Sequence, residues 1–120
     1  MANIFLDTNI LIDLYERDPA KAKEYTGHKL YISPLSCHIL CYTEKVKIPD
    51  AKLTQLLTNI GLVDLNSEVL SRSLSGPTND IEDNLQLHSA VRANCEYFIT
   101  RDKLLLKMAY FGKTKITSEM

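Results

Sequence analysis

Four aspartates stand at positions where α/β proteins commonly gather their chemistry. Asp7 ends a short apolar run, residues 3–7, and Asp102 comes just after a later run of the same kind. Asp80 and Asp83 are three residues apart in the first turn of a predicted helix, so their side chains share one helix face. In an open parallel sheet, ligands bind beyond the carboxyl ends of the strands. We therefore expect these acids to lie together at one edge of a sheet.

A cluster of carboxylates predicts a divalent cation. Carboxylates that are brought together repel each other and raise one another's pKa values. Mg²⁺ or Mn²⁺ relieves that repulsion, and such hard cations bind a few carboxylate oxygens together with waters. Each acid also has an ordinary explanation, since Asp80, Asp83 and Asp102 suit helix N-termini. Asp7 is harder to explain in this way, because an unpaired carboxylate directly after a buried strand is costly. As a set, the acids predict a metal site.

Apolar runs alternate with segments of helical period along the whole chain. Strands are predicted at residues 3–7, 29–33, 61–65, 96–100 and, at an edge, 114–117. Helices are predicted at residues 10–15, 19–26, 34–45, 51–60, 67–70, 80–94 and 102–111. Such alternation requires crossover connections, which give a parallel sheet with helices on both faces. We therefore predict a single domain, residues 1–120, with a three-layer α/β/α fold and a parallel sheet of four or five strands.

The composition excludes several classes of protein. The 120 residues are 45% hydrophobic and carry 14 Lys+Arg against 15 Asp+Glu, a formal net charge of −1. This balance excludes a chain that is disordered by high charge and low hydrophobicity. It also argues against a protein that binds nucleic acid by bulk positive charge. Any attraction to phosphate must then come from a local patch or from a bound cation.

The N-terminal segment, the apolar runs and the cysteines predict a cytoplasmic protein. The segment MANIFLDTNI lacks the positive region of a signal peptide, and no apolar run approaches the roughly 20 residues of a membrane span. Cys37, Cys41 and Cys95 are odd in number and lack the spacing of a zinc site. We interpret them as core thiols in a reducing compartment.

Three segments resemble the motifs of the PIN domain family. Residues 4–11, IFLDTNIL, are similar to its opening motif, a hydrophobic strand ending in Asp-Thr-Asn. Residues 80–86, DIEDNLQ, with Ala90 further on, resemble its third motif, and residues 99–102, ITRD, resemble its fourth. The motifs occur in the family's order, and the resemblance covers essentially the whole chain.

Small stand-alone bacterial PIN domains mostly resemble the VapC-type toxins of toxin–antitoxin pairs. The resemblance therefore implies a Mg²⁺- or Mn²⁺-dependent endoribonuclease that cleaves RNA, forms a homodimer and is held by a partner antitoxin. In this chain Asp7, Asp83 and Asp102 would be the metal ligands and catalytic residues, acting through a metal-activated water. The accessory residues that the resemblance implies are Asn9 and Thr100, which would orient the acids, and Asp80, an additional acid.

The segment after the second predicted strand departs from the family pattern. The family usually places a Glu on the helix that follows a Ser at the end of this strand, but here the helix after Ser33 begins without an acid. His38 stands at or one residue before the expected place, where it could ligate metal, bind phosphate or be structural. Glu44, more than one turn further on, is either a replacement or a solvated residue at the helix end.

Positive charge for RNA is scattered along the chain. Arg101 adjoins the predicted site and could meet an RNA phosphate bidentately. The lysines Lys45, Lys47, Lys103 and Lys107 are equally well explained as solvated charge on helix faces.

Two alternative functions remain open. The missing acid and the near-neutral charge fit a catalytically weak or inactive PIN-like domain that binds RNA or a protein partner. A response-regulator-like domain also places acids at strand ends, but it needs an acidic pair after the first strand. This chain has a single Asp there, followed by Thr and Asn.

Overall fold

The computed structural model describes the backbone of residues 1–120 and every side chain except those of residues 19 and 21. Within these residues the strands form one six-stranded sheet in the order β3-β2-β1-β4-β6-β5. The strands are β1 (Asn3–Leu6), β2 (Lys29–Ile32), β3 (Ile60–Leu62), β4 (Tyr97–Ile99), β5 (Tyr110–Phe111) and β6 (Thr114–Thr117). Neighbouring strands are parallel except for β5 and β6, which are antiparallel.

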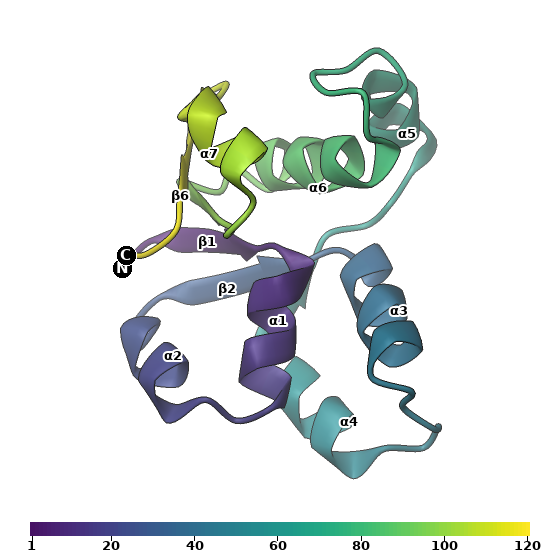
Figure 1. Ribbon diagram of the computed structural model, residues 1–120, viewed down its shortest axis with the longest axis vertical. Helices are drawn as coiled ribbons and strands as arrows, with labels where there is room; N and C mark the ends of the chain where they lie inside the picture. The colour runs from purple at the N-terminus through teal and green to yellow at the C-terminus, as the bar shows by residue number, and fades with distance from the viewer.

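Helices lie on both sides of this sheet. Figure 1 shows α1 to α4 on one side and α5 to α7 on the other. The helices are α1 (Thr8–Tyr15), α2 (Pro19–Glu24), α3 (Pro34–Thr43), α4 (Ala51–Leu57), α5 (Ser67–Ser73), α6 (Ile81–Arg92) and α7 (Lys103–Met108). The predicted three-layer α/β/α class is therefore confirmed. Among the helices that the structure describes, none is both long enough and apolar enough to cross a membrane.

The central strand β1 is buried on both faces, and this burial places Asp7. Side chains of a strand alternate between the two faces of its sheet. Ile4 and Leu6 therefore pack into the core beneath α1, α3 and α4, while Phe5 packs into the core beneath α6 and α7. Phe5 stacks on Phe98 of β4 with ring centroids 5.6 Å apart. Asp7, the next residue, thus emerges at the middle of the sheet's carboxyl edge.

The C-terminal region differs from the prediction of a helix through residue 111. Helix α7 ends at Met108, Ala109 adopts a left-handed φ of 64°, and residues 110–111 form the short strand β5. Gly112 begins a two-residue loop between β5 and β6, with a φ of 60°. Two-residue hairpin loops favour Gly at such a positive φ. The sheet therefore has one strand more than the sequence predicted.

Candidate active site

Asp7 is held in place by bonds to both of its carboxylate oxygens. It caps α1, since the backbone N–H of Thr8 donates to Oδ1 at 2.8 Å. The hydroxyl of Thr100, at the end of β4, donates to Oδ2 at 2.7 Å. The side chain is 8% exposed, and burial raises the pKa of Asp7 although both hydrogen bonds lower it. Asp7 is thus a buried, oriented carboxylate at the junction of β1, α1 and β4.

Asp102 is oriented by the next helix and by the same threonine. Its Oδ1 accepts from the backbone N–H groups of Leu104 and Leu105, at 2.8 and 3.2 Å, and so caps α7. Its own N–H donates to the hydroxyl of Thr100 at 3.0 Å. Thr100 therefore bridges Asp7 and Asp102, which is the position the resemblance implied for an orienting residue.

Asp83 faces the other acids from α6. Asp80 caps this helix by accepting from the N–H of Asp83 at 3.1 Å. Burial and neighbouring carboxylates together raise the pKa of Asp83 from 3.8 to about 6, and burial is the larger cause. Those neighbours, in order of effect, are Asp80, Asp102, Asp7 and Glu82. The predicted acids of three separate segments thus share one region of space.

Glu82 belongs to the same region, although it was not among the predicted site residues. Burial, followed by the charges of Asp80 and Asp7, raises the pKa of Glu82. The residue lies within the motif of residues 80–86, so the signal that could have found it was its place in the first turn of the helix that carries Asp83.

The acids gather in this region without closing on a common point. Among the side chains that the structure describes, no three of the types His, Cys, Asp and Glu lie close enough to hold a metal ion together. The chemistry of the donors nevertheless fits Mg²⁺ or Mn²⁺, because both cations prefer carboxylate oxygens. The repulsion that raises the pKa of Asp83 is the interaction that such a cation would relieve.

The remaining predicted residues differ in their distance from the acids along the chain, and Asn9 is only two residues after Asp7. Asn9 and His38 are exposed, on α1 and α3 respectively. Glu44 follows the last turn of α3 and shares a hydrogen bond with Glu16, which raises the pKa of Glu44. Glu16 caps the C-terminus of α1, whereas Asp7 caps its N-terminus. The structure therefore does not bring Glu44 to the other acids.

Arg101 already has an acidic partner within the chain. Its Nη1 lies 2.6 Å from Oδ2 of Asp13, and its Nη2 lies 3.5 Å from Oδ1. Asp13 is on α1, one to two turns beyond Asp7, and was not among the predicted site residues. The pair leaves the Arg101 side chain 52% exposed beside the acids.

Asn84 anchors the loop that leads into α6. Its Oδ1 accepts from the N–H and the hydroxyl of Thr78, at 2.9 and 2.6 Å. Its Nδ2 donates to the carbonyls of Ser73 and Thr78, each at 2.9 Å. All four hydrogen-bonding positions of the amide are therefore used. Residues 75–79, SGPTN, have the composition of a loop, but nothing in the sequence predicts the bonds by which Asn84 holds it.

Comparison with known proteins identifies the fold. A family model for the PIN domain matches residues 4–110. The VapBC2 complex of Rickettsia felis, solved with a DNA fragment from its promoter, aligns with a TM-score of 0.70 and 16% identity over 95% of this chain and 96% of that chain. A toxin–antitoxin complex from Klebsiella pneumoniae aligns with a TM-score of 0.72 and 20% identity over 92% and 94%. No curated protein matches the sequence.

The family model covers far more than half of the chain. Its span includes the three motifs that carry the resemblance, from the strand before Asp7 to the helix after Asp102. The chain belongs to the PIN domain family.

Proposed function

We propose that this PIN domain is a Mg²⁺- or Mn²⁺-dependent endoribonuclease and the toxin of a toxin–antitoxin pair. One observation carries the proposal, namely that Asp83 lies among other carboxylates from separate segments. Burial, followed by the charges of Asp80, Asp102, Asp7 and Glu82, raises the pKa of Asp83 to about 6. Such a gathering of like charges costs folding free energy and is typical of functional sites. The similarity in fold to two toxin–antitoxin complexes supports the biological context.

The chain's own residues would divide the work of binding and orientation. When bound, a divalent cation supplies a water of lowered pKa and offsets negative charge on the phosphate. Asp7 and Asp102 would bind the cation in orientations held by Thr100, and Asp83 would bind it from α6. Arg101 would exchange its bond to Asp13 for a phosphate oxygen of the RNA, because a guanidinium fork suits both partners.

A second function is favoured by the absence of an acid near the start of α3. Glu44, at the end of α3, contacts Glu16 at the C-terminal end of α1, away from Asp7. The site therefore holds no acid from α3, which fits a PIN-like domain that binds RNA without cutting it. Glu82 argues for the enzyme, because it adds a carboxylate to the region from α6.

Cleavage of RNA by the purified protein separates these two functions. We expect cleavage with Mn²⁺ or Mg²⁺, no cleavage after removal of the cation with EDTA, and recovery when Mn²⁺ is returned. The matched control is Asp83→Ala purified in the same way, which should be inactive. Equal cleavage by wild type and Asp83→Ala would assign the activity to a contaminating nuclease, and RNA binding without cleavage would favour the second function.

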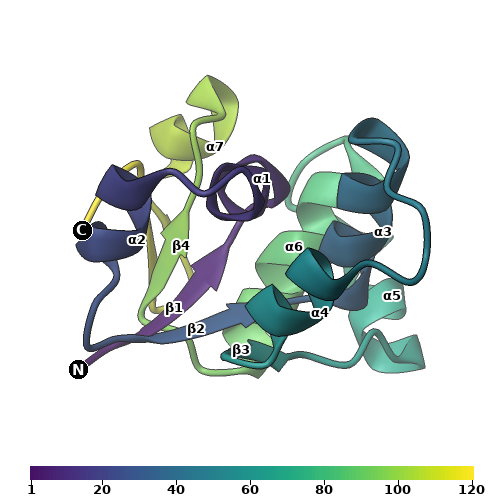
Figure 2. The same ribbon diagram turned by 90° about the horizontal axis from the view of Figure 1, so that it is seen from below.

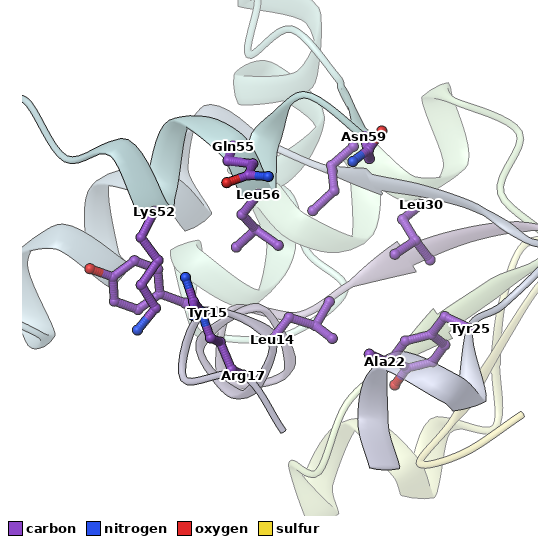
Figure 3. Close-up of a pocket in the computed structure, with 11 residues that line it drawn as sticks. Leu14, Tyr15, Arg17, Ala22, Tyr25, Leu30, Lys52, Gln55, Leu56 and Asn59 are labelled. Atoms are coloured by element: carbon purple, nitrogen blue, oxygen red, sulfur yellow. The ribbon is translucent and has the colours of Figure 1, made fainter. Parts of the chain in front are cut away.

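A groove beside the sheet offers a place for the partner protein. It has a volume of about 550 Å³ and runs between α1, α4 and the end of α2. Figure 3 shows Leu14, Leu30 and Leu56 directed into it, with Arg17 and Lys52 grouped at one end beside Tyr15. We propose that a segment of the partner binds here, placing apolar side chains in the groove and an acidic side chain against Arg17 and Lys52.

The groove proposal predicts a loss of affinity on Leu56→Asp. The probe is the purified product of the reading frame adjacent to this chain's own, titrated by calorimetry. We expect its Kd to rise at least roughly 30-fold, because a charge in the apolar centre of an interface removes a strong contact. Lys52→Glu should also weaken binding and has little effect on folding, since it lies at the groove's rim.

The control for this substitution is Leu74→Asp, a change of the same type at an exposed leucine that follows α5. It should bind as wild type does. Unchanged affinity of both groove variants would contradict this docking site, and an adjacent product with no affinity for the wild type would contradict the proposed partner.

The homodimer that the resemblance implied stays a prediction. Two apolar helical segments, residues 35–42 and 53–60, are candidate surfaces for it, and either could instead be core. The first contains Tyr42, which is 82% exposed, while Leu40 is buried. In the second, Leu53 is buried and Leu56 lines the groove, so the first surface is the better candidate.

A further inference from the structure

Gln86 is a polar side chain in the centre of the molecule. It lies on α6 and is 0% exposed. Its Oε1 accepts from the hydroxyl of Ser33 at 2.7 Å, and its Nε2 donates to the hydroxyls of Ser36 at 2.7 Å and of Thr8 at 3.2 Å. The side chain therefore holds three hydroxyls that come from other parts of the chain.

These bonds join the N-terminal ends of α1 and α3 to the second turn of α6. Thr8 is the first residue of α1, Ser33 precedes α3, and Ser36 lies in its first turn. The hydroxyl of Thr8 also donates to that of Ser36 at 3.3 Å, which links α1 and α3 directly. In Figure 2, α6 is seen between α1 and α3, the two helices that Gln86 holds. We call Thr8, Ser33, Ser36 and Gln86 the hydroxyl–amide cluster.

The cluster leads to two of the candidate metal ligands. Asp83 is three residues before Gln86, so the two side chains share one face of α6. On the other side, Thr8 follows Asp7 in the chain and donates its N–H to the carboxylate of Asp7. A continuous path of bonded groups therefore runs from α6 through Gln86 and Thr8 to Asp7.

All four side chains of the cluster are buried, which restricts how they can be arranged. A buried polar group without a hydrogen-bond partner costs about 1–3 kcal/mol. Moving α1 or α3 relative to α6 would break bonds of Gln86 that water cannot replace. A fully bonded buried network of this kind specifies one arrangement of the elements that it joins.

We propose that Gln86 is a positioning residue of the cation site, and that it fixes the separation of Asp7 and Asp83 by holding α1 to α6. The proposal rests on the cation site proposed above. Before a cation binds, the carboxylates repel one another and would drive the two helices apart. The amide of Gln86 opposes that movement, so it limits how far Asp7 and Asp83 must move to close on a cation.

Gln86→Leu tests this role, with Leu87→Ala as the matched control. Leu87 is equally buried on the same helix but packs in the apolar core on α6's side of the sheet, away from Thr8. We expect Gln86→Leu to raise the Kd for Mn²⁺ about tenfold or more, as loss of groups that orient metal ligands typically does. Leu87→Ala should lower thermal stability but leave the Kd within about twofold.

Hydrogen exchange gives a readout that needs no metal. The N–H groups of Ile10 and Leu11 donate to the carbonyl of Asp7 at the start of α1. In Gln86→Leu the exchange rates of these N–H groups should rise more than about tenfold beyond the increase expected from the lower free energy of global unfolding. In Leu87→Ala their rates should rise only as much as the lower free energy of global unfolding requires. Exchange that follows global stability in both variants would overturn the anchoring role.

Thr8 provides a second approach if Gln86→Leu folds poorly. Thr8→Val removes the hydroxyl with little change in shape and should weaken Mn²⁺ binding as Gln86→Leu does, while Thr8→Ser should retain wild-type affinity. Because both changes remove the hydrogen bond between Gln86 and Thr8, their effects on Kd should not add fully in the double variant. Full additivity, or a wild-type Kd in Thr8→Val, would overturn the proposal. A wild-type protein that binds no Mn²⁺ would contradict the cation site instead, and the exchange comparison would still decide the role of Gln86.

Discussion

Asp83→Asn is expected to make the protein more stable at pH 7 and to weaken its binding of the cation. The folded state raises the pKa of Asp83 from 3.8 to about 6, so folding favours the protonated form. Stability is therefore lost as the pH rises from about 4 to about 6. Asn cannot ionise and avoids this loss. For a fully buried group the shift would correspond to roughly 3 kcal/mol. Asp83 is half-buried and screened by solvent, so we expect a gain of about 1 kcal/mol.

Denaturant unfolding at two pH values measures this gain. The free energy of unfolding of Asp83→Asn should exceed that of the wild type at pH 7. The two should be equal below about pH 3.8, where the wild-type carboxyl is protonated in both the folded and the unfolded state. Glu119→Gln, which neutralises an exposed acid near the C-terminus, is the control and should change stability little at either pH. A gain of the same size at both pH values would contradict the electrostatic cause. A lower stability of Asp83→Asn than of the wild type at pH 7 would contradict the claim that burial and neighbouring carboxylates destabilise the charged Asp83.

Asp7→Asn is expected to lower the rate of RNA cleavage by roughly 100-fold or more. A carboxylate that holds a catalytic cation contributes through that cation several kcal/mol of transition-state stabilisation, which corresponds to such a factor. The fold should survive, because Asn caps helices about as well as Asp and can still accept from the N–H of Thr8. The measurement is cleavage of a defined RNA under single-turnover conditions with Mn²⁺.

The control for Asp7→Asn is the same substitution at Asp64. Asp64 also follows a strand, β3, but in the sheet β2 separates that strand from β1, and the Asp64 side chain is exposed. Asp64→Asn should cleave RNA at the wild-type rate. Retained cleavage in Asp7→Asn, or an equal loss in Asp64→Asn, would contradict the assigned role of Asp7.

The sequence predicted the framework of the site because short-range patterns determine it. An apolar run that ends in an acid located Asp7 at the end of β1, and the spacing of Asp80 and Asp83 located the cap of α6. For these aspartates, capping a helix and binding a cation are compatible roles. Asp7, Asp80 and Asp102 all cap helices, and capping orients their side chains at the N-terminal ends of α1, α6 and α7.

The parts that were not predicted depend on contacts between distant residues. The pair of Arg101 with Asp13 joins residues 88 positions apart, and Gln86 bonds to Thr8 across 78. Nothing in the sequence around Arg101 or Gln86 indicates which distant residue each of them contacts. Gln86 in particular looks like an ordinary helix-surface residue, although the fold buries it completely. The position of Glu44 was unpredictable for the same reason, since it depends on how α3 packs against α1.

Titration of Mn²⁺ into cation-free protein by calorimetry tests the central claim most directly, namely that Asp7, Asp83 and Asp102 hold one divalent cation. We predict a binding isotherm for the wild type and a Kd at least about tenfold higher for Asp7→Asn, Asp83→Asn and Asp102→Asn, each a folded protein. No binding by the wild type, or wild-type affinity in the three variants, would contradict the claim.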